Sequence, residues 1–308
     1  MSPTRPTPTI AASGARVAKA AAQAKVNLLL RALSRESSGY HQIETVFQRL
    51  DLADEVTVRT GVAGRSVDCT GEAIADRGVG PAEENLAYRA ATAYFEAAGW
   101  PDGFAIEIVK RIPVGGGLGG GSADAGAVLR ILETLAPRPM GVRVLELAAR
   151  LGADVPFMTT EIPLALAWGR GERMAGLTTL PRRRVQIVVP PFGVATVDAY
   201  RWLAESRAAY EPTGTLLPAP ALLSWPEVEE IAENEFEGPV GEHHPEIGAY
   251  RKAMERAGAR ISMLAGSGSS VFGVFDEGVR GLLATDLDDA RLIETRTSAH
   301  VVPVRVLE

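Results

Sequence analysis

The residues best suited to chemistry in this sequence form a glycine-rich stretch. Six of the seven residues from Gly115 to Gly121 are glycine, and Ser122 follows them. Glycine lets backbone N–H groups approach an anion closely, and a helix N-terminus adds unpaired N–H groups and a favourable dipole. An alternating apolar segment, 104–109, precedes the stretch, and a helical pattern over 125–132 follows it. This order predicts a nucleotide phosphate site. The alternative is a flexible linker, but linkers mix glycine with serine and lack ordered elements on both sides.

The stretch differs from two common nucleotide-binding patterns. The Walker pattern needs a lysine before its serine, whereas Ser122 directly follows Gly121. A run of glycines matches the dinucleotide pattern G-x-G-x-x-G by default, and Glu133, the nearest acid downstream apart from Asp124, lies inside the predicted helix. An NAD-dependent oxidoreductase is therefore the weaker alternative.

Two charged residues have types that suit phosphoryl transfer. Lys25 interrupts an apolar strand pattern, and Asp154 follows a predicted helix end in the segment Gly-Ala-Asp-Val-Pro. A lysine holds a phosphate or lowers the pKa of a neighbouring group, and a carboxylate often lies near the acceptor hydroxyl. The alternatives are an edge-strand lysine that blocks aggregation and an aspartate that caps a helix or lies on the surface.

Two further positions have both a binding and a structural interpretation. Tyr40 and His41 follow Gly39 in a predicted turn, where they would stack on a flat ring or form a half-buried pair. Ser122 either caps the following helix or also places its hydroxyl on a Mg²⁺-bound phosphate.

Helical and alternating patterns predict the elements that position these residues. Lys25 and Asn27 share one face of an early strand, because side chains repeat every two residues. The mixture of helices and strands predicts an α+β or α/β protein with two lobes. A second glycine turn, 266–270, is either strand–turn packing or a ligand site. Helices are expected at 85–98, 144–151 and 245–257, and strands at 26–30, 56–58, 104–109, 186–189 and 271–275.

Composition excludes several classes of function. The chain has 308 residues and a net charge of −6, and it lacks a basic cluster with interleaved aromatics, so nucleic acid is not expected as a partner. Cys69 is the only cysteine, the four histidines lack metal-ligand spacing, and no apolar run is long enough to span a membrane. We therefore expect a cytoplasmic protein with no membrane partner. Residues 1–22 contain no acid and are expected to form a disordered tail, with an organelle transit peptide as the alternative.

These segments together resemble the GHMP kinase superfamily, and within it the kinases that act on 4-diphosphocytidyl-2-C-methyl-D-erythritol. The glycine loop is typical of the superfamily, whereas A-K-x-N-L, G-Y-H and L-G-A-D-V-P are typical of the smaller group. The matching segments run in family order over roughly residues 20–275: Ala24–Leu28, Gly39–His41, Thr45–Asp51, Asn85–Arg89, Pro113–Asp124, Leu151–Pro156, Asn234–Glu237 and Gly266–Ser269.

The resemblance implies a fold and a reaction. The fold is an α+β, two-lobed GHMP kinase with its active site in the cleft between an ATP-binding domain, 23–165, and a C-terminal domain, 166–308. The reaction moves the γ-phosphate of ATP, with Mg²⁺, to the 2-hydroxyl of the cytidyl substrate, in the non-mevalonate (MEP) route to isoprenoid precursors. The implied partner is this small molecule, and the implied assembly is a monomer or a homodimer.

The resemblance also implies residue roles. Asp154 is the expected catalytic carboxylate, with Lys25 beside it, and Asn27 holds the methylerythritol end. The base is expected on Tyr40, His41 and Phe47, with Thr196 and Tyr200 closing over it from the second lobe. The residues expected to bind ATP are Pro113, Gly115, Gly116, Gly117, Leu118, Gly119, Gly120, Gly121 and Ser122, together with Asn85 and Lys110.

Some positions depart from the family pattern. Trp168 and Arg170 occur in the G-x-G-E segment, Glu235 replaces an aspartate, and Ala123-Asp124 follows the glycine loop where Ser-Asn or Ser-Asp is usual. Two other functions stay open. One is another GHMP kinase of the mevalonate or homoserine type, which the Gly39–His41 segment argues against. The other is a nucleotide-binding homologue that has lost catalysis, which the presence of both Lys25 and Asp154 argues against.

Overall fold

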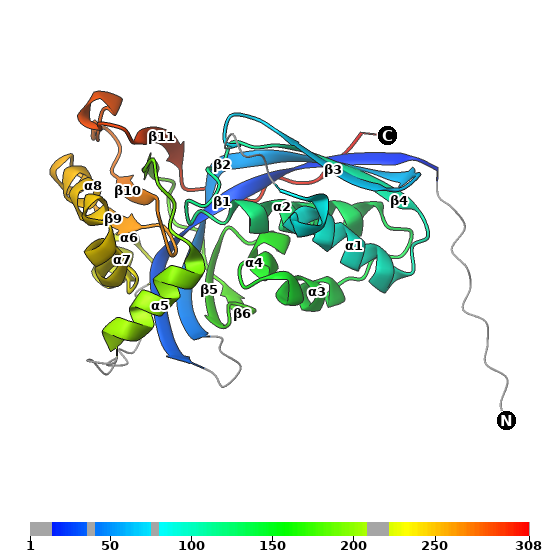
Figure 1. Cartoon of the computed structure of the whole chain (residues 1–308), viewed down its shortest axis with the longest axis horizontal. Coiled ribbons are helices and arrows are strands. Elements are labelled where there is room, and N and C mark those ends of the chain that lie inside the picture. Colours follow the sequence, from blue (N-terminus) through cyan, green and yellow to red (C-terminus); the bar gives the residue numbers. More distant parts are fainter. Residues whose placement is uncertain (1–13, 36–40, 75–79, 208–221, 308) are drawn as a thin grey trace.

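The computed structural model describes residues 14–35, 41–74, 80–207 and 222–307, which form two lobes, each built on a β-sheet (Figure 1). Among these residues the first sheet contains eight strands, with β12, β1, β2, β4 and β3 in that order, β5 and then β6 attached beyond β2, and β8 attached to β1. Its strands are β1 (Arg16–Arg35), β2 (His41–Val62), β3 (Arg65–Thr70), β4 (Gly103–Val109), β5 (Leu164–Gly169), β6 (Arg173–Gly176), β8 (Glu233–Asn234) and β12 (Arg305–Val306).

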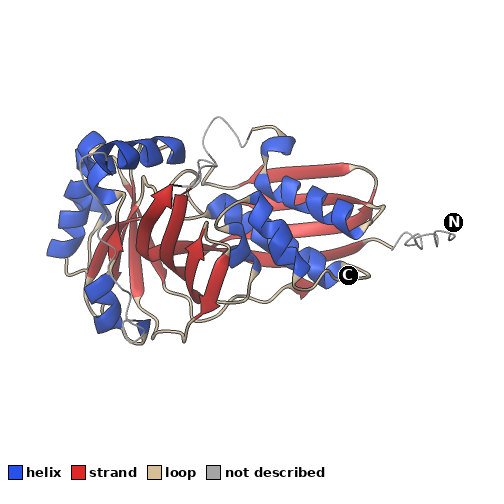
Figure 2. Cartoon of the chain, turned by 90° about the horizontal axis from the view of Figure 1, so that it is seen from below, coloured by secondary structure: helices blue, strands red, loops and turns tan. Residues whose placement is uncertain are grey.

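Helices cover one face of the first sheet, as Figure 2 shows. They are α1 (Leu86–Ala98), α2 (Gly120–Leu135), α3 (Arg143–Leu151) and α4 (Val155–Thr159), with a short 3₁₀ turn at Ala82–Glu84 before α1. The side chain of Asn85 caps the start of α1, and Gly99 ends it in the left-handed conformation. The predicted strands at 26–30, 56–58 and 104–109 and the helices at 85–98 and 144–151 all occur.

The second lobe is a four-stranded antiparallel sheet in the order β11, β7, β10, β9. Helix α8 packs on β9 and β10, and the contacts of the lobe form a second apolar core. Its strands are β7 (Arg184–Val189), β9 (Ile261–Leu264), β10 (Val271–Phe275) and β11 (Arg291–Arg296), and its helices are α5 (Thr196–Arg207), α6 (Trp225–Ile231), α7 (Glu237–His243), α8 (Pro245–Arg256) and the 3₁₀ turn Ala284–Asp286. The predicted α+β class and the two lobes are confirmed.

Small side chains let α2 lie close against β1. The even-numbered alanines of β1, from Ala18 to Ala24, are all buried and share one face of the strand. Helix α2 is itself rich in small residues, and a Cβ at Gly126 would lie 2.4 Å from the backbone carbon of Met158 in α4. This close packing fixes the start of α2, and with it the glycine loop, over the middle of β1.

The structure corrects both expected domain bounds. Residues 16–22 belong to β1, where Ala18, Ala20 and Ala22 are buried, so the expected tail ends before Arg16, and residues 1–13 lie outside the described part. The absence of acidic residues suggested a tail, but residues 16–22 form a strand whose alanines are buried where β1 packs against α2. The expected boundary after residue 165 falls inside β5, which pairs with both β2 and β6, so the first sheet continues to Gly176.

Among the described residues, no helix is long and apolar enough to cross a membrane.

Candidate active site

A cleft of about 1260 Å³ opens along the glycine loop and is lined by residues of both lobes. From the first lobe it takes the loop itself, the middle of β1 and the segment before α4. From the second lobe it takes one side of α5 along most of its length, Phe236 and the second glycine turn. The predicted site residues that line it are Lys25, Asn27, Asn85, Lys110, Pro113, Gly115, Gly116, Gly117, Leu118, Gly119, Gly120, Gly121, Ser122, Asp154, Thr196 and Tyr200.

The glycine loop needs glycine for both conformation and space. Gly115, Gly117 and Gly119 have φ values of 76°, 77° and 72°, a region that side chains disfavour. A Cβ at Gly117 would lie 1.8 Å from the carbonyl oxygen of Ala265 in the second lobe. Helix α2 begins directly after Gly119 without a side-chain cap, so its first N–H groups have no capping oxygen. The loop is therefore shaped to present backbone donors to an anion.

Lys25 and Asp154 meet at the base of this loop. Lys25 is 4% exposed, and its Nζ lies 3.3 Å from Asp154 Oδ2 and 2.8 Å from Asn27 Oδ1. Asn27 Nδ2 donates to Thr45 Oγ1 at 2.7 Å, and that hydroxyl donates to the carbonyl oxygen of Leu29 at 2.7 Å. The ammonium group therefore has a fixed place, set by a chain of hydrogen bonds from the neighbouring strand.

The carboxylate of Asp154 is available to a ligand. Asp154 occupies the N-cap position of α4, yet its side chain accepts no capping hydrogen bond. The side chain of Asp154 is 26% exposed and lines the cleft. The alternative suggested by the sequence, a residue that serves only as a helix cap, does not describe this geometry.

The second lobe supplies Thr196 and Tyr200 from the first turns of α5. Thr196 Oγ1 lies 3.1 Å from Ser267 Oγ in the second glycine turn. The ring of Tyr200 packs edge-on against Phe236, with centroids 4.8 Å apart. Burial, and then the charge of Asp154, raises the pKa of Tyr200 to about 12, so its phenol stays protonated over the physiological range.

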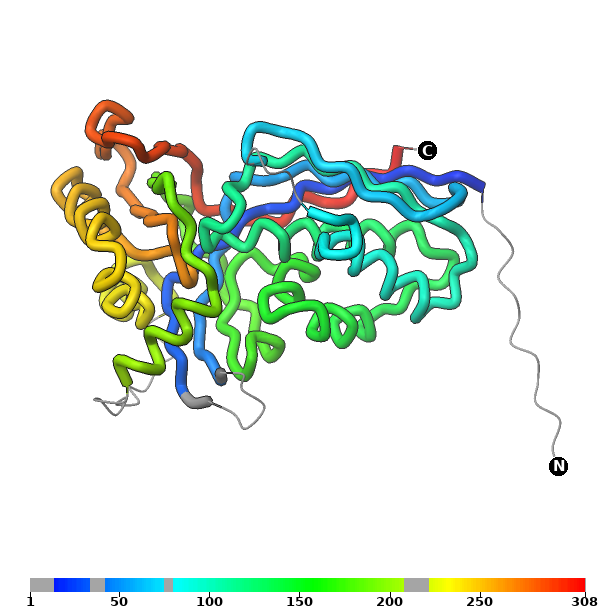
Figure 3. The backbone as a smooth tube through the Cα atoms, in the orientation of Figure 1, coloured from blue at the N-terminus to red at the C-terminus, as the bar shows by residue number. Residues whose placement is uncertain are grey.

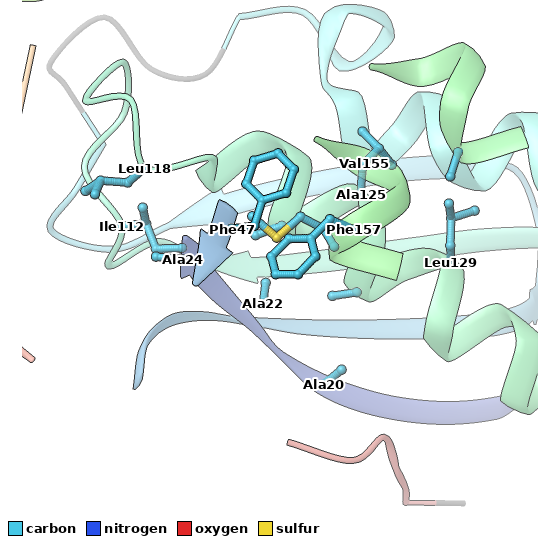
Figure 4. Packing of buried hydrophobic residues seen from close by; sticks show 14 of the residues in the cluster. Ala20, Ala22, Ala24, Phe47, Ile112, Leu118, Ala125, Leu129, Val155 and Phe157 are labelled. Carbon is cyan, nitrogen blue, oxygen red and sulfur yellow. The ribbon is translucent and has the colours of Figure 1, made fainter. Parts of the chain in front are cut away.

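Phe47 does not lie where the sequence suggested. Its side chain is fully buried and stacks on Phe157, with ring centroids 4.9 Å apart (Figure 4). A ring with no exposed surface cannot stack on a base, so the expected contact with the cytidine is wrong. Phe47 is paired with Ala165 of β5, and both residues belong to the apolar core of the first lobe. It contributes to the site only as support, 5.6 Å below Lys25 Nζ.

The other two residues expected to bind the base remain predictions. Tyr40 lies outside the described residues. His41 begins β2, opposite Arg35 of β1, but its side chain is outside the described part.

Lys110 belongs to a buried group of charges that the sequence did not suggest. Its Nζ donates to Asp54 and, at 2.6 Å, to Asp124, and it is 5% exposed. Asp54 also accepts from the backbone N–H of Ile112 at 2.8 Å, which ties the group to the start of the glycine loop. Asn85 chiefly caps α1, and its Nδ2 donates weakly to Cys69 Sγ at 3.5 Å.

Asp54 and Asp124 were missed because their partner is distant in sequence. Asp124 did carry a signal, since it is an acid on the apolar face of the predicted helix, and such a residue is seldom buried without a partner. One of its oxygens, Oδ1, is buried and has no hydrogen-bond partner among the described residues. Burial raises the pKa of Asp124 to about 8. The positive charge of Lys110 opposes this increase, and the negative charge of Asp54 adds to it.

Comparison with known proteins shows the family to which this chain belongs. The family profile of the GHMP kinases N terminal domain matches residues 85–161, and that of the GHMP kinases C terminal domain matches residues 219–294. A 4-diphosphocytidyl-2-C-methyl-D-erythritol kinase of Geobacter sp. strain M21 is 38% identical over 258 residues, which are 83% of this chain and 89% of that one. The chain belongs to this family of GHMP kinases.

Other members of the family match over greater lengths. The Pelotomaculum thermopropionicum kinase of the same name is 37% identical over 91% of this chain and 93% of its own. A crystal structure of 4-(cytidine 5′-diphospho)-2C-methyl-D-erythritol kinase has a TM-score of 0.68 at 35% identity and covers 91% of this chain and 99% of its own. Homoserine kinase of Cytophaga hutchinsonii, at 18% identity, 98% and 100% coverage and a TM-score of 0.66, shares the fold.

Proposed function

We propose that this chain is an ATP-dependent kinase that phosphorylates the 2-hydroxyl of 4-diphosphocytidyl-2-C-methyl-D-erythritol, on the MEP route to isoprenoid precursors. The observation that carries the chemistry is the Lys25–Asp154 pair, which lies in the same cleft as the glycine loop. The relatives named above support the choice of substrate. ATP is the phosphoryl donor expected of the family.

The glycine loop and the start of α2 receive the phosphates of ATP. Backbone N–H groups and the helix dipole compensate phosphate charge without a side chain. We propose that Mg²⁺ enters as the complex with ATP, with the hydroxyl of Ser122 directed at a phosphate. Entry of Mg²⁺ together with ATP fits the ligands that the protein offers. In the described part of the chain, no group of three or more His, Cys, Asp or Glu residues could hold a metal ion.

Asp154 and Lys25 prepare the acceptor hydroxyl. The Asp154 carboxylate accepts a hydrogen bond from the 2-hydroxyl and is the group placed to take its proton. The hydroxyl oxygen forms a bond to the γ-phosphorus as the bond to the bridging oxygen of ADP breaks. Lys25, with its ammonium group fixed by Asn27 and Asp154, offsets the negative charge that develops.

The base of the acceptor lies at the far end of the same cleft. We propose that Tyr40 and His41 contact it from the first lobe and that Thr196 and Tyr200 close over it from the second. A monomeric or dimeric state and a cytoplasmic location remain predictions from the sequence.

The direct test is phosphorylation with ATP and Mg²⁺, offered in parallel to the cytidyl substrate, mevalonate and homoserine. We expect turnover of the cytidyl substrate alone. Turnover of one of the other alcohols would keep the kinase chemistry and discard the cytidine site. Absence of turnover on all three, with ATP still bound in a calorimetric titration, would favour a homologue that has lost catalysis.

A further inference from the structure

Asp154 reaches the cleft from the start of a very short helix. Helix α4 has five residues, and Asp154 is its N-cap. A helix of this length is not stable by itself in water, because its few hydrogen bonds do not offset the cost of forming the first turn. The place of Asp154 beside Lys25 is therefore set by the contacts that the rest of the protein makes with α4.

A buried arginine of β2 holds the other end of α4. Arg49 is 1% exposed, and its Nη2 donates to the carbonyl oxygens of Phe157 at 2.7 Å and Thr160 at 3.0 Å. Its Nε donates to the carbonyl oxygen of Ile162 at 3.1 Å, shortly before β5 begins. The last carbonyl groups of a helix lack partners within it, and a cation near them also interacts favourably with the helix dipole. Arg49 therefore joins the end of α4 and the segment after it to the sheet.

The same arginine lies opposite Lys25. In the pairing of β1 with β2, Arg49 is the partner of Lys25. Directly opposed residues of an antiparallel pair project from the same face of the sheet. From this face Lys25 reaches Asp154 at the start of α4, and Arg49 reaches the carbonyl groups at its end. One pair of opposed residues thus contacts both ends of the helix.

Two stacked rings connect the two cations. The guanidinium carbon of Arg49 lies 4.7 Å from the ring centroid of Phe157, and that ring stacks on Phe47 (Figure 4). The ring of Phe47 in turn faces the ammonium group of Lys25. A cation is attracted to an aromatic face, most strongly where water is excluded. An unbroken series of contacts therefore runs from the arginine to the lysine.

We propose that Arg49 is a positioning residue that holds α4 so that Asp154 stays beside Lys25 at the acceptor hydroxyl. The inference rests on the proposed function, because Asp154 must act on that hydroxyl. Arg49 does not line the cleft, so it acts through the helix. Without its guanidinium group, the end of α4 and the segment after it lose three hydrogen bonds. A helix of little more than one turn transmits a shift at one end to the other, and a displacement of about 1 Å at reacting groups costs about a hundredfold in rate.

The first variant is Arg49→Met, which keeps the apolar bulk of the side chain and removes its hydrogen-bond donors. The close contact of α4 with Gly126 remains, so the variant should fold with a lower melting temperature. Its kcat should fall about ten- to hundredfold, whereas the KM values for ATP and for the acceptor should stay within about threefold. A lower melting temperature with the kcat of the folded enzyme unchanged is the result of a merely structural role, and it would overturn the proposal.

Arg49→Lys is the conservative variant. It keeps the charge and loses the planar set of donors, so its kcat should lie between those of the wild type and Arg49→Met. If Arg49→Met does not fold, Arg49→Lys carries the test with the same criteria: a fall in kcat at unchanged KM values supports the positioning role, and an unchanged kcat rejects it.

Arg130→Met is the matched control. Arg130 is also buried, and it donates to the carbonyl oxygens of Ala21 at 2.8 Å and Val302 at 3.1 Å, neither of which belongs to α4. This variant should also melt at a lower temperature, but its kcat should stay within about twofold of wild type. An equal fall in kcat in both variants would contradict the proposal, because the loss of any buried arginine would then have the same effect.

Combination with Asp154→Asn tests whether Arg49 acts through Asp154. In the Asp154→Asn background, Arg49→Met should lower kcat by no more than about threefold, because the carboxylate that Arg49 positions is already absent. A loss as large as in the wild-type background would overturn the proposal.

Failure of the proposed function would look different. If Asp154→Asn alone kept the wild-type kcat, the catalytic role of Asp154 would be wrong, and the positioning role of Arg49 would be rejected with it. If Asp154→Asn lost activity while Arg49→Met kept it, only the role of Arg49 would be rejected. An enzyme that phosphorylates mevalonate or homoserine instead would lose the acceptor assignment, and the same variants assayed on that alcohol would still decide the role of Arg49.

Discussion

At the residue scale, Asp154 is the group with the most specific expected role. Its carboxylate is partly exposed, lines the cleft and lies beside a fixed ammonium group. Asp154→Asn should lower kcat about 10²- to 10⁴-fold, the range for loss of a general base, whereas the affinity for ATP should stay within about twofold. Steady-state kinetics and calorimetry check the two halves separately. A variant within a few-fold of the wild-type kcat would show that the carboxylate does not act on the acceptor hydroxyl.

A second prediction at this scale concerns the titration of Asp124. Burial raises the pKa of Asp124 from 3.8 to about 8 in the folded protein. Between about pH 4 and pH 8 the unfolded chain therefore loses this proton while the folded chain keeps it. The stability that depends on this group is complete below pH 4 and is lost as the pH rises through 8.

Asp124→Asn removes that titration while keeping the shape of the side chain. Urea unfolding at pH 5, 7 and 9 should show that the wild-type protein loses stability relative to the variant as the pH increases. Because Lys110 keeps its bond to Asp54, the variant retains a partner for the buried ammonium group. A stability difference that is constant across the three pH values would contradict the raised pKa.

At the element scale, the two glycine turns form one unit. Gly117 contacts Ala265, and the backbone N–H of Ser270 donates to the carbonyl oxygen of Gly116 at 3.3 Å. Gly117→Ala forces a Cβ into a backbone carbonyl at a left-handed φ, so it should lower the free energy of unfolding by about 2–4 kcal/mol. Gly121→Ala is the control, because a Cβ there meets no atom of the described residues within 4 Å. Thermal melts of the two variants test this, and equal losses would argue against the contact.

Local patterns in the sequence predicted most helices and strands. They did not predict which face of each element is buried or which distant residues it contacts. The helix after Asn85, the strand before the glycine loop and the helix after it follow from capping, alternation and 3.6-residue periodicity. Phe47 was misplaced because the resemblance carries a role over by position in a motif and does not say which face of the strand is buried. The pairing of Lys110 with Asp54 joins the residue directly after β4 to a residue of β2, which only the β2–β4 register brings together.

At the scale of the whole molecule, the second lobe is an insertion within the first. The described chain builds most of the first sheet up to Gly176 and then forms the second lobe, from which the short strand β8 also pairs with β1. It then returns to pair β12 with Ala18 and Lys19 of β1. Figure 3 shows this last segment beside β1. Further bonds join the return path to the first lobe, since Gln23 Nε2 donates to Ser298 Oγ at 2.9 Å. The sequence could not predict this pairing, because a strand of two residues is too short to show an alternating pattern.

The return of the chain has a consequence for synthesis on the ribosome. Chains usually fold from the N-terminus as each domain emerges. Here the edge of β1 that will pair with Arg305 and Val306 is made first and is covered last. Until residues 298–306 emerge, the nascent first lobe carries an open strand edge that can pair with another chain. Fast synthesis of the second lobe, or a chaperone at the ribosome exit, would shorten that exposure.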